Sequence, residues 1–314
     1  MAFSADQLLE KVNTYLATMP YVREPKGLYA PIEYVLSLGG KRIRPVLMLL
    51  SYQLYKENVD DILPQAAGIE TYHNYTLLHD DLMDCADMRR NKPTVHKVWD
   101  ENTAILSGDA MLVLAYRLMN NCPERYLRQV MDIFSQTALE ICEGQQWDME
   151  FETRNDVTVP EYMEMIRLKT SVLLSAALKI GAVLGGASED DARKLYDFGI
   201  KMGLAFQLQD DYLDVYGDSK VFGKNIGGDI LCNKKTFMLI NALALADGIQ
   251  RKELEKWIAS TAFCPEEKIK AVTALYDKIG IGGICEEKIN AYYVEGLSSV
   301  SYTHLRAHET LMNL

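Results

Sequence analysis

The chain has 314 residues, 48% of them apolar and 25% charged, and its formal net charge is −11. This composition excludes disordered and collagen-like proteins and is ordinary for a globular protein with a sizeable core. The acidic balance argues against nucleic acid as the main partner, because phosphate backbones are bound by basic surfaces.

The cysteines and the apolar runs indicate the compartment. Six scattered cysteines contain no C-x-x-C pair, so the sequence indicates no zinc site and suits reduced thiols in a cytosolic protein. The first residues, MAFSAD, lack a basic segment followed by an apolar stretch, which argues against a signal peptide. No run approaches the roughly 18 to 20 apolar residues that span a bilayer. We therefore predict a cytoplasmic protein without a transmembrane segment.

Helical periodicity dominates the chain. It predicts helices over 4–18, 31–38, 44–56, 62–83, 109–120, 124–146, 160–184, 189–216, 235–246, 252–260, 265–279 and 283–294. No alternating strand pair or hairpin turn is predicted. Since no linker divides the chain, we expect one all-helical domain over residues 1–300. Residues 301–314 are expected to form an atypical tail with a weak apolar pattern, for which a non-native origin stays open.

A glycine-rich loop, GGKRIRP at residues 39–45, joins the second and third predicted helices. Its backbone N–H groups could approach an anion, and Lys41 and Arg44 add positive charge near a helix start. The pattern is weak alone, because basic surface loops are common. His73, two helical turns before the first acidic cluster, is equally open to a core role and to a functional one.

Two Asp-Asp-x-x-Asp clusters stand out, at residues 80–84 and 210–214. Asp80 and Asp84 lie four residues apart, so on a helix their carboxylates share a face. Like charges this close are costly unless a cation lies between them, and Mg²⁺ typically takes one or two carboxylates together with phosphate oxygens and water. A solvated acidic face is the alternative for either cluster. Apolar sequence precedes both, which favours two metal-binding helices that face one another.

Basic residues accompany the acidic clusters. Arg89 and Arg90 follow the first cluster closely enough to grip a phosphate, or they merely neutralise nearby aspartates. The segment 222–229 and Lys234 follow the second cluster and are interpreted as a lid that supplies lysines, with a plain surface loop as the alternative. It is not a P-loop, because G-x-x-x-x-G-K-[ST] is absent. Lys169, inside an apolar helix, either snorkels to the surface or points into a site.

The motifs DDLMDCADMRRNKPTVH, FQLQDDYLDVYGD, FGKNIGGDI and NKKT, in this order, resemble those of the trans-prenyl diphosphate synthases, the polyprenyl synthase family. The resemblance implies an all-α isoprenoid synthase fold, a bundle of antiparallel helices around a deep central cavity, usually in a homodimer. It also implies that an allylic diphosphate (dimethylallyl, geranyl or farnesyl) ionises with the help of roughly three Mg²⁺ ions. Isopentenyl diphosphate then attacks C1, and loss of a proton gives an allylic product one C5 unit longer.

The resemblance also implies a role for each matching residue. Metal-site residues would be Asp80, Asp84, Asp210 and Asp214. Support through waters or hydrogen bonds would come from Asp81 and Asp211. The allylic diphosphate would be held by Arg89, Lys224 and Lys234. Isopentenyl diphosphate would be held by Lys41, Arg44, His73 and Arg90. The developing allylic cation and its leaving group would be faced by Lys169, Thr170 and Gln207.

Product length is a question of cavity depth along the helix before the first cluster, where each turn spans about 5.4 Å. In the family the fifth residue before DDxxD often acts as a floor, and here that residue is Tyr75. A helical wheel instead favours Tyr72 and Thr76 as cavity-facing. The aromatic floor, the small Thr76 and the uninterrupted first motif resemble geranylgeranyl synthases, so we predict products of C15–C20. Core or dimer packing is the alternative role for both tyrosines.

The sequence favours a synthase over three other function classes. A class I terpene cyclase ionises the same kind of substrate, but its second metal motif is normally Asn/Asp-rich with Ser/Thr and Glu. A non-catalytic partner subunit of another synthase commonly loses aspartates from one motif, and both motifs are intact here. A di-iron helical bundle needs Glu-x-x-His pairs, which the five histidines do not supply.

Overall fold

The computed structural model describes residues 2–21, 23–217 and 226–301. The chain divides into two compact units, each of which is described by itself. The first comprises Met1–Thr137, Leu173–Tyr196 and Val300–Leu314, and the second comprises Ala138–Val172 and Asp197–Ser299. The expectation of one domain over residues 1–300 stays a prediction, and residues 302–314 of the expected tail lie outside the described residues.

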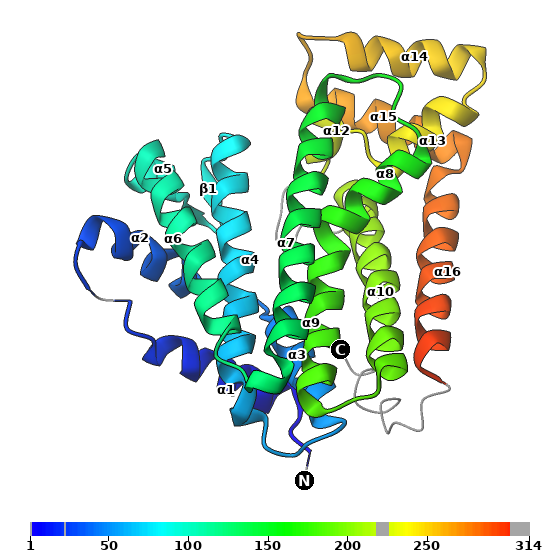
Figure 1. Ribbon diagram of the computed structural model, residues 1–314. Coiled ribbons are helices and arrows are strands. Elements are labelled where there is room, and N and C mark those ends of the chain that lie inside the picture. The colour runs from blue at the N-terminus through cyan, green and yellow to red at the C-terminus, as the bar shows by residue number, and fades with distance from the viewer. Residues whose placement is uncertain (1, 22, 218–225, 302–314) are drawn as a thin grey trace. The chain divides into compact units, whose positions relative to one another are not determined.

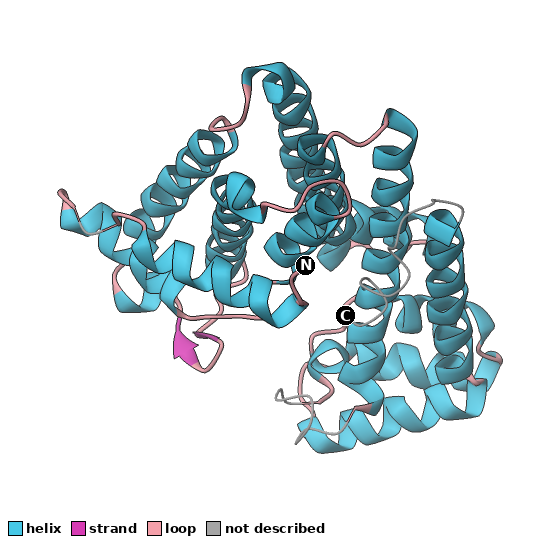
Figure 2. Cartoon of the chain, turned by 90° about the horizontal axis from the view of Figure 1, so that it is seen from below, coloured by secondary structure: helices cyan, strands magenta, loops and turns pink. Residues whose placement is uncertain are grey.

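The all-α prediction is confirmed, since helices form almost all the regular structure of the described residues (Figures 1 and 2). Up to residue 119 the elements are α1 (Ala5–Thr18), α2 (Lys26–Ser37), α3 (Ile43–Gln53), the 3₁₀ turn η1 (Val59–Ile62), α4 (Leu63–Met83), β1 (Met88–Arg89), β2 (Lys92–Pro93), α5 (Val95–Val98) and α6 (Glu101–Met119). From residue 124 they are α7 (Glu124–Thr153), α8 (Val159–Ile166), the π-helical turn η2 (Arg167–Ser171), α9 (Val172–Gly185), α10 (Glu189–Tyr216), α12 (Gly228–Leu231), α13 (Phe237–Leu245), α14 (Gly248–Ala259), α15 (Pro265–Ile279) and α16 (Ile281–Ser301).

Several helix ends agree with the prediction. Both α10 and α15 begin and end at the predicted residues. α1 begins after Ser4, whose hydroxyl oxygen accepts a hydrogen bond from the Gln7 backbone N–H at 3.3 Å. The Gln7 side chain in turn accepts a bond from the Ser4 N–H at 2.9 Å. This reciprocal capping box satisfies two N–H groups that the first helical turn leaves unpaired.

Other helix ends were predicted wrongly. α2 begins at Lys26, not at residue 31, and Pro31 lies inside it. The missing proline N–H removes only the bond to the carbonyl of Gly27, close to the start of the helix, where the loss is small. α6 begins at Glu101, not at residue 109, because the Asp100 carboxylate accepts a hydrogen bond from the Thr103 N–H at 2.8 Å and caps the helix.

A short hairpin corrects the prediction that no hairpin is present. β1 and β2 pair antiparallel, and both residues of the connecting turn have positive φ, 52° at Arg90 and 60° at Asn91. Two left-handed residues define a type I′ turn, which matches the twist of a two-residue hairpin. Arginine is an unusual first residue for such a turn, which is why the sequence did not reveal it. Across this turn the Arg89 side chain reaches Asp81, whereas the Arg90 side chain reaches the carbonyl of Gly39.

The core of the first unit is built around α4 and α6, which lie side by side and antiparallel (Figure 1). Glycines allow the close approach. A Cβ atom on Gly68 would lie 3.2 Å from the Cβ of Leu118, and one on Gly108 would overlap the His79 ring. This close packing fixes the helix that carries the first acidic cluster.

The core of the second unit collects side chains from α8, α10, α13, α15 and α16, among them the fully buried Leu208 and Met238. Lys201 of α10 pairs with Glu295 of α16 at 2.5 Å, and the two helices lie side by side (Figure 1). Among the described residues, only the stretch Val159–Gly185 is long and apolar enough to cross a membrane by length and composition. Of the most apolar 18 residues of this stretch, 78% are buried inside the protein.

Candidate functional site

The first acidic cluster lies at the C-terminal end of α4, in the first unit. Asp81 is buried, Asp80 is half-buried and Asp84 is exposed at the C-cap. Nε and Nη2 of Arg89 donate to Oδ1 of Asp81 at 2.9 and 2.6 Å, and Nη2 lies 3.7 Å from Oδ2 of Asp80. Burial raises the pKa of Asp81, and the hydrogen bond from Arg89 opposes that rise. The hairpin thus brings a guanidinium to the cluster.

Three predicted substrate-binding residues of the first unit come together beside the glycine-rich loop. Nη1 of Arg44 lies 3.1 Å from Nε2 of His73. Burial, and then the charges of Arg44 and Arg90, hold the pKa of His73 well below its ordinary value. The imidazole is therefore neutral at pH 7, and its Nε2 is assigned as the acceptor because arginine can only donate. Arg90 donates to the carbonyl of Gly39.

Glycine is required where Arg90 meets the loop. Gly40 has φ +137°, and a Cβ there would lie 2.7 Å from Nη2 of Arg90. Lys41 follows on the exposed side of the same loop. The structure therefore brings Arg44, His73 and Arg90 together with Lys41 next in the chain.

A buried ion pair, missed by the sequence analysis, supports this loop. Arg42 is 5% exposed and adopts φ 48° at the N-cap of α3. Its Nη1 lies 2.5 Å from Oε1 of Glu70, and its Nη2 donates to the Leu36 carbonyl at 2.6 Å. Asn74 donates to the same Glu70 oxygen at 2.8 Å. Glu70 could have revealed this ion pair in the sequence. It is an acidic residue in the apolar run before the first cluster, and such a residue must be paired if it is buried.

The predicted chain-length residues belong to a line of rings in the first unit. The ring of Tyr75 lies 4.8 Å from that of His79 and 5.4 Å from that of Tyr72. Phe134 packs edge-on against both Tyr72, at 5.2 Å, and Tyr116, at 4.9 Å. Tyr72 is 1% exposed, whereas Tyr75 is half-buried. Thr76 is also half-buried, and its hydroxyl donates to the His73 carbonyl at 2.8 Å. Tyr75 is therefore the more accessible of the two tyrosines.

Lys169 and Thr170 lie in the π-helical turn η2, in the second unit. The Nζ of Lys169 lies 2.6 Å from a carboxylate oxygen of Asp148, and the Thr170 hydroxyl donates to Oε1 of Gln207 at 3.1 Å. Burial alone would raise the pKa of Asp148, but the charges of Lys234 and Lys169 outweigh it and hold the pKa below its ordinary value. Asp148 was not predicted. It pairs directly with Lys169 and is influenced by the charge of Lys234, and single π turns of this kind recur at functional sites.

Two glycines hold the π turn in place. A Cβ on Gly144 would lie 2.5 Å from the backbone nitrogen of Lys169, and one on Gly203 would lie 2.7 Å from the Cα of Ser171. These contacts are with backbone atoms, which cannot rotate away. The turn is therefore packed directly against α7 and α10.

We expect Gly203→Ala to destabilise the protein by about 1–3 kcal/mol, because the added methyl group overlaps the backbone of η2. The free energy of unfolding in urea measures this. Gly248→Ala is the matched control, since a Cβ there meets nothing within 4 Å. Equal unfolding midpoints for the two variants would contradict the proposed packing.

The second acidic cluster lies near the C-terminal end of α10. Asp211 is 4% exposed and accepts hydrogen bonds from the Tyr162 hydroxyl and from Nε2 of Gln207, the latter at 3.2 Å. Burial, opposed by the Tyr162 hydrogen bond, raises the pKa of Asp211 to about 7. Asp210 and Asp214 are half-buried. Tyr162, another residue that the sequence analysis missed, therefore fixes the inner carboxylate of the cluster.

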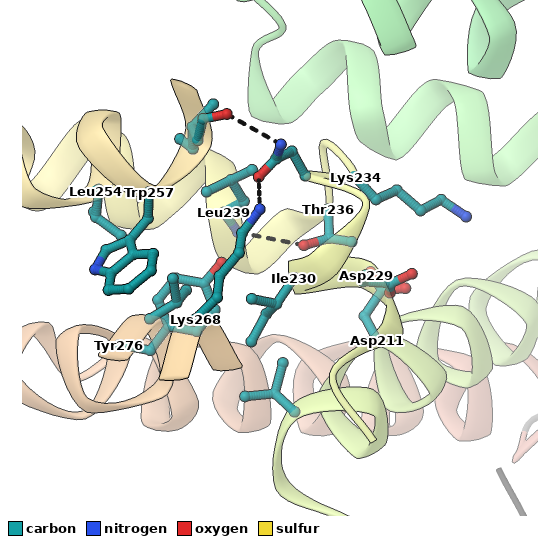
Figure 3. Close-up of a pocket in the computed structure, with 14 residues that line it drawn as sticks. Asp211, Asp229, Ile230, Lys234, Thr236, Leu239, Leu254, Trp257, Lys268 and Tyr276 are labelled. Atoms are coloured by element: carbon teal, nitrogen blue, oxygen red, sulfur yellow. Dashed lines mark hydrogen bonds between the residues drawn. The ribbon is translucent and has the colours of Figure 1, made fainter. Parts of the chain in front are cut away.

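The chain after this cluster returns to it. The Asp229 N–H donates to Oδ2 of Asp214 at 3.0 Å. Figure 3 shows Asp229 close to Asp211, with Lys234 extending from the following turn. Lys224 lies outside the described residues, so its predicted role stays a prediction.

The donor chemistry of both clusters fits a hard divalent cation. Their side chains are carboxylates near the C-terminal ends of α4 and α10, where the helix dipole adds negative potential. Within the described ranges, no three His, Cys, Asp or Glu side chains form a group that could hold an ion by themselves. Mg²⁺ usually takes one or two carboxylates and completes its shell with water and phosphate oxygens. Carboxylate pairs therefore fit Mg²⁺ if a diphosphate supplies further oxygens.

Comparisons with known proteins agree with this chemistry. The sequence model described as polyprenyl synthetase matches residues 25–276. A short chain isoprenyl diphosphate synthase of Methanocaldococcus jannaschii is 41% identical over 273 residues, covering 87% of this chain and 83% of the relative. A solved geranylgeranyl pyrophosphate synthase matches with TM-score 0.93 and 43% identity, covering 99% and 96% of the two chains. Another, from Corynebacterium glutamicum and complexed with isoprenyl diphosphate and magnesium, matches with TM-score 0.87 and 25% identity, covering 99% and 97%.

Proposed function

Because the chain belongs to the polyprenyl synthetase family, we propose that it is a short-chain trans-prenyl diphosphate synthase with products of C15–C20. It would join isopentenyl diphosphate to a dimethylallyl, geranyl or farnesyl diphosphate. The observation that carries the proposal is that two helix ends each present an Asp-Asp-x-x-Asp cluster with fixed cationic side chains in the same unit. Arg89 pairs with the first cluster, and Lys169 and Lys234 act on Asp148 in the unit of the second.

The proposed division of labour follows from the charges. When bound, roughly three Mg²⁺ ions would neutralise the diphosphate as it leaves. Asp80, Asp84, Asp210 and Asp214 would hold these ions, with Asp81 and Asp211 orienting their neighbours. Cations fixed in advance stabilise the charge that develops on a leaving group. As the family resemblance implies, the allylic diphosphate would be bound by Arg89, Lys224 and Lys234.

A separate cationic group is proposed for isopentenyl diphosphate. It consists of the cations Lys41, Arg44 and Arg90 together with the neutral His73. Neutral His73 accepts from Arg44 at Nε2, so its Nδ1–H remains a donor for a phosphate oxygen. In the second unit Lys169, Thr170 and Gln207 would face the allylic cation, with the Lys169 charge balanced by Asp148.

The decisive experiment is incubation with Mg²⁺, radiolabelled isopentenyl diphosphate and each allylic primer in turn, followed by product analysis. We expect label in C15–C20 products, and EDTA should abolish its incorporation. A class I terpene cyclase would convert the allylic diphosphate without incorporating label. A non-catalytic partner subunit would yield no product alone. Either result would overturn the proposal.

We also propose that the protein is cytoplasmic and that it forms a homodimer. The homodimer is supported by three exposed apolar side chains on α6, because Ile105, Leu106 and Val113 are 46%, 60% and 60% exposed. Covering these side chains in an interface would remove apolar surface from water. Light scattering after size-exclusion chromatography should give twice the chain mass, and Leu106→Glu should shift the mass toward a monomer.

Tyr75→Ala is expected to lengthen the product by at least one C5 unit, because it removes the half-buried ring beside the first cluster. Chromatography of the products formed from farnesyl diphosphate measures the change. Thr76→Ala is the control, because Thr76 offers little volume to lose. An unchanged product profile in Tyr75→Ala would reject the role of Tyr75 as a floor.

A further inference from the structure

A buried lysine in the second unit has no role in the reaction proposed above. Lys268 of α15 is 1% exposed. Its Nζ donates to Oδ1 of Asn233 at 2.8 Å and to the Leu231 carbonyl at 3.3 Å, and it lies 4.2 Å from the centroid of the Phe263 ring. A buried charge is costly unless polar groups compensate it. The ammonium of Lys268 therefore forms a specific contact with the segment that follows α12.

Asn233 sets the direction in which the chain leaves α12. It has φ 53°, its N–H donates to the Ile230 carbonyl at 3.2 Å, and the Lys234 N–H donates to the Asp229 carbonyl at 2.9 Å. These two bonds form a Schellman motif, with asparagine at the left-handed position. The Asn233 side chain is held from two helices, because its Nδ2 donates to the Ile258 carbonyl of α14 at 3.2 Å while Oδ1 accepts from Lys268.

The opposite end of α12 is attached to the second acidic cluster. Asp214 accepts the Asp229 N–H through its carboxylate at 3.0 Å and the Gly227 N–H through its carbonyl at 2.6 Å. The single turn of α12 is therefore held at one end by Asp214 and at the other by Asn233 with Lys268. Figure 3 shows Lys268 reaching from α15 toward this turn, and Lys234 extending from it on another side.

We propose that Lys268 and Asn233 are positioning residues for Lys234, which itself would contact the allylic diphosphate. The inference rests on the proposed function and deepens it. A long exposed lysine loses much conformational freedom when it binds an anion, and a backbone fixed in advance reduces that loss. Lys268 fixes this backbone by donating hydrogen bonds to the Leu231 carbonyl and to the side chain of Asn233, the residue in the left-handed conformation.

The test compares Lys268→Met, which keeps the apolar stem, with Asn233→Gly, which keeps the left-handed backbone. Removing a hydrogen bond to a charged group is expected to raise KM for the allylic diphosphate about tenfold or more. KM for isopentenyl diphosphate should stay unchanged. In the double variant Lys268→Met/Asn233→Gly, the increases should not multiply.

Val272→Ala is the matched control for loss of packing. Val272 lies on α15, is buried and belongs to the same core. We expect it to lower Tm as Lys268→Met does, without raising KM for the allylic diphosphate. The inference is overturned if Lys268→Met and Val272→Ala change both KM values alike.

A binding measurement separates this inference from the proposed function. Titration calorimetry with Mg²⁺ and inorganic pyrophosphate requires no turnover, and Lys268→Met should weaken pyrophosphate binding while Val272→Ala should not. If the wild-type protein makes no product, the proposed function fails, but weaker pyrophosphate binding by Lys268→Met would still support the positioning role. Equal pyrophosphate affinity in wild type and Lys268→Met would overturn the positioning role even if product forms.

Discussion

Asp80→Asn and Asp210→Asn are each expected to lower kcat by roughly 10³-fold or more, because each removes a carboxylate that, as proposed, would hold the Mg²⁺ needed to neutralise the leaving diphosphate. Asparagine keeps the size of the side chain, so folding should be little changed. Steady-state incorporation of labelled isopentenyl diphosphate at saturating Mg²⁺ measures kcat. Restoration of activity at very high Mg²⁺ would indicate that only metal affinity had been lost.

The double variant Asp80→Asn/Asp210→Asn tests whether both clusters serve one reaction step. Residues that act as a unit are strongly non-additive, so the double variant should be little worse than the single ones. Asp132→Asn is the control, because Asp132 is exposed and pairs only loosely with Arg128 at 3.8 Å. Two losses that multiply fully would show that the clusters act independently.

Glu70→Ala is expected to destabilise the protein by about 3–5 kcal/mol, because it leaves Arg42 buried without its carboxylate. The side chains of the pair are 3% and 2% exposed, and the two atoms lie 2.5 Å apart. Asn74 also loses an acceptor. Urea unfolding measures the loss. Replacement of both partners by apolar residues, Arg42→Met with Glu70→Leu, should recover most of it.

The control for Glu70→Ala is Asp132→Ala. It breaks a pair whose side chains are 96% and 75% exposed, and such pairs contribute about 0.5 kcal/mol or less. Comparable losses in the two variants would show that burial does not determine the contribution of the Arg42–Glu70 pair.

Helical periodicity and local capping signals were sufficient to predict many of the helices from the sequence. The bounds of α10 and α15 follow directly from apolar spacing between clear start and stop signals. The start of α2 was missed because Pro31 resembles a first-turn residue although it lies inside the helix. The π turn at Arg167–Ser171 could not be predicted, because it depends on contacts with Gly144 and Gly203, which are remote in sequence.

In the candidate site too, features set by local sequence could be predicted and features set by remote contacts could not. Carboxylate spacing indicated both clusters, since the relevant residues lie within one helical turn or so of each other. The partners that hold two site side chains in place are remote in sequence. Tyr162, which bonds Asp211, lies 49 residues from it, and Asp148, which pairs with Lys169, lies 21 residues from it. Such pairings are formed by tertiary packing, so no local pattern in a single sequence encodes them. The roles of the individual site residues remain predictions for the variants above.

The line of rings from His79 to Tyr116 also bears on how product size could diverge among descendants of this protein. Tyr75 is half-buried near one end of the line, whereas Tyr72 is wedged between Tyr75 and Phe134 in the core. A truncation at Tyr72 would open a void costing about 3–5 kcal/mol, a large share of the stability of an ordinary domain. If Tyr75 limits product length as proposed, evolutionary change toward longer isoprenoids is more accessible through codon 75 than through codon 72.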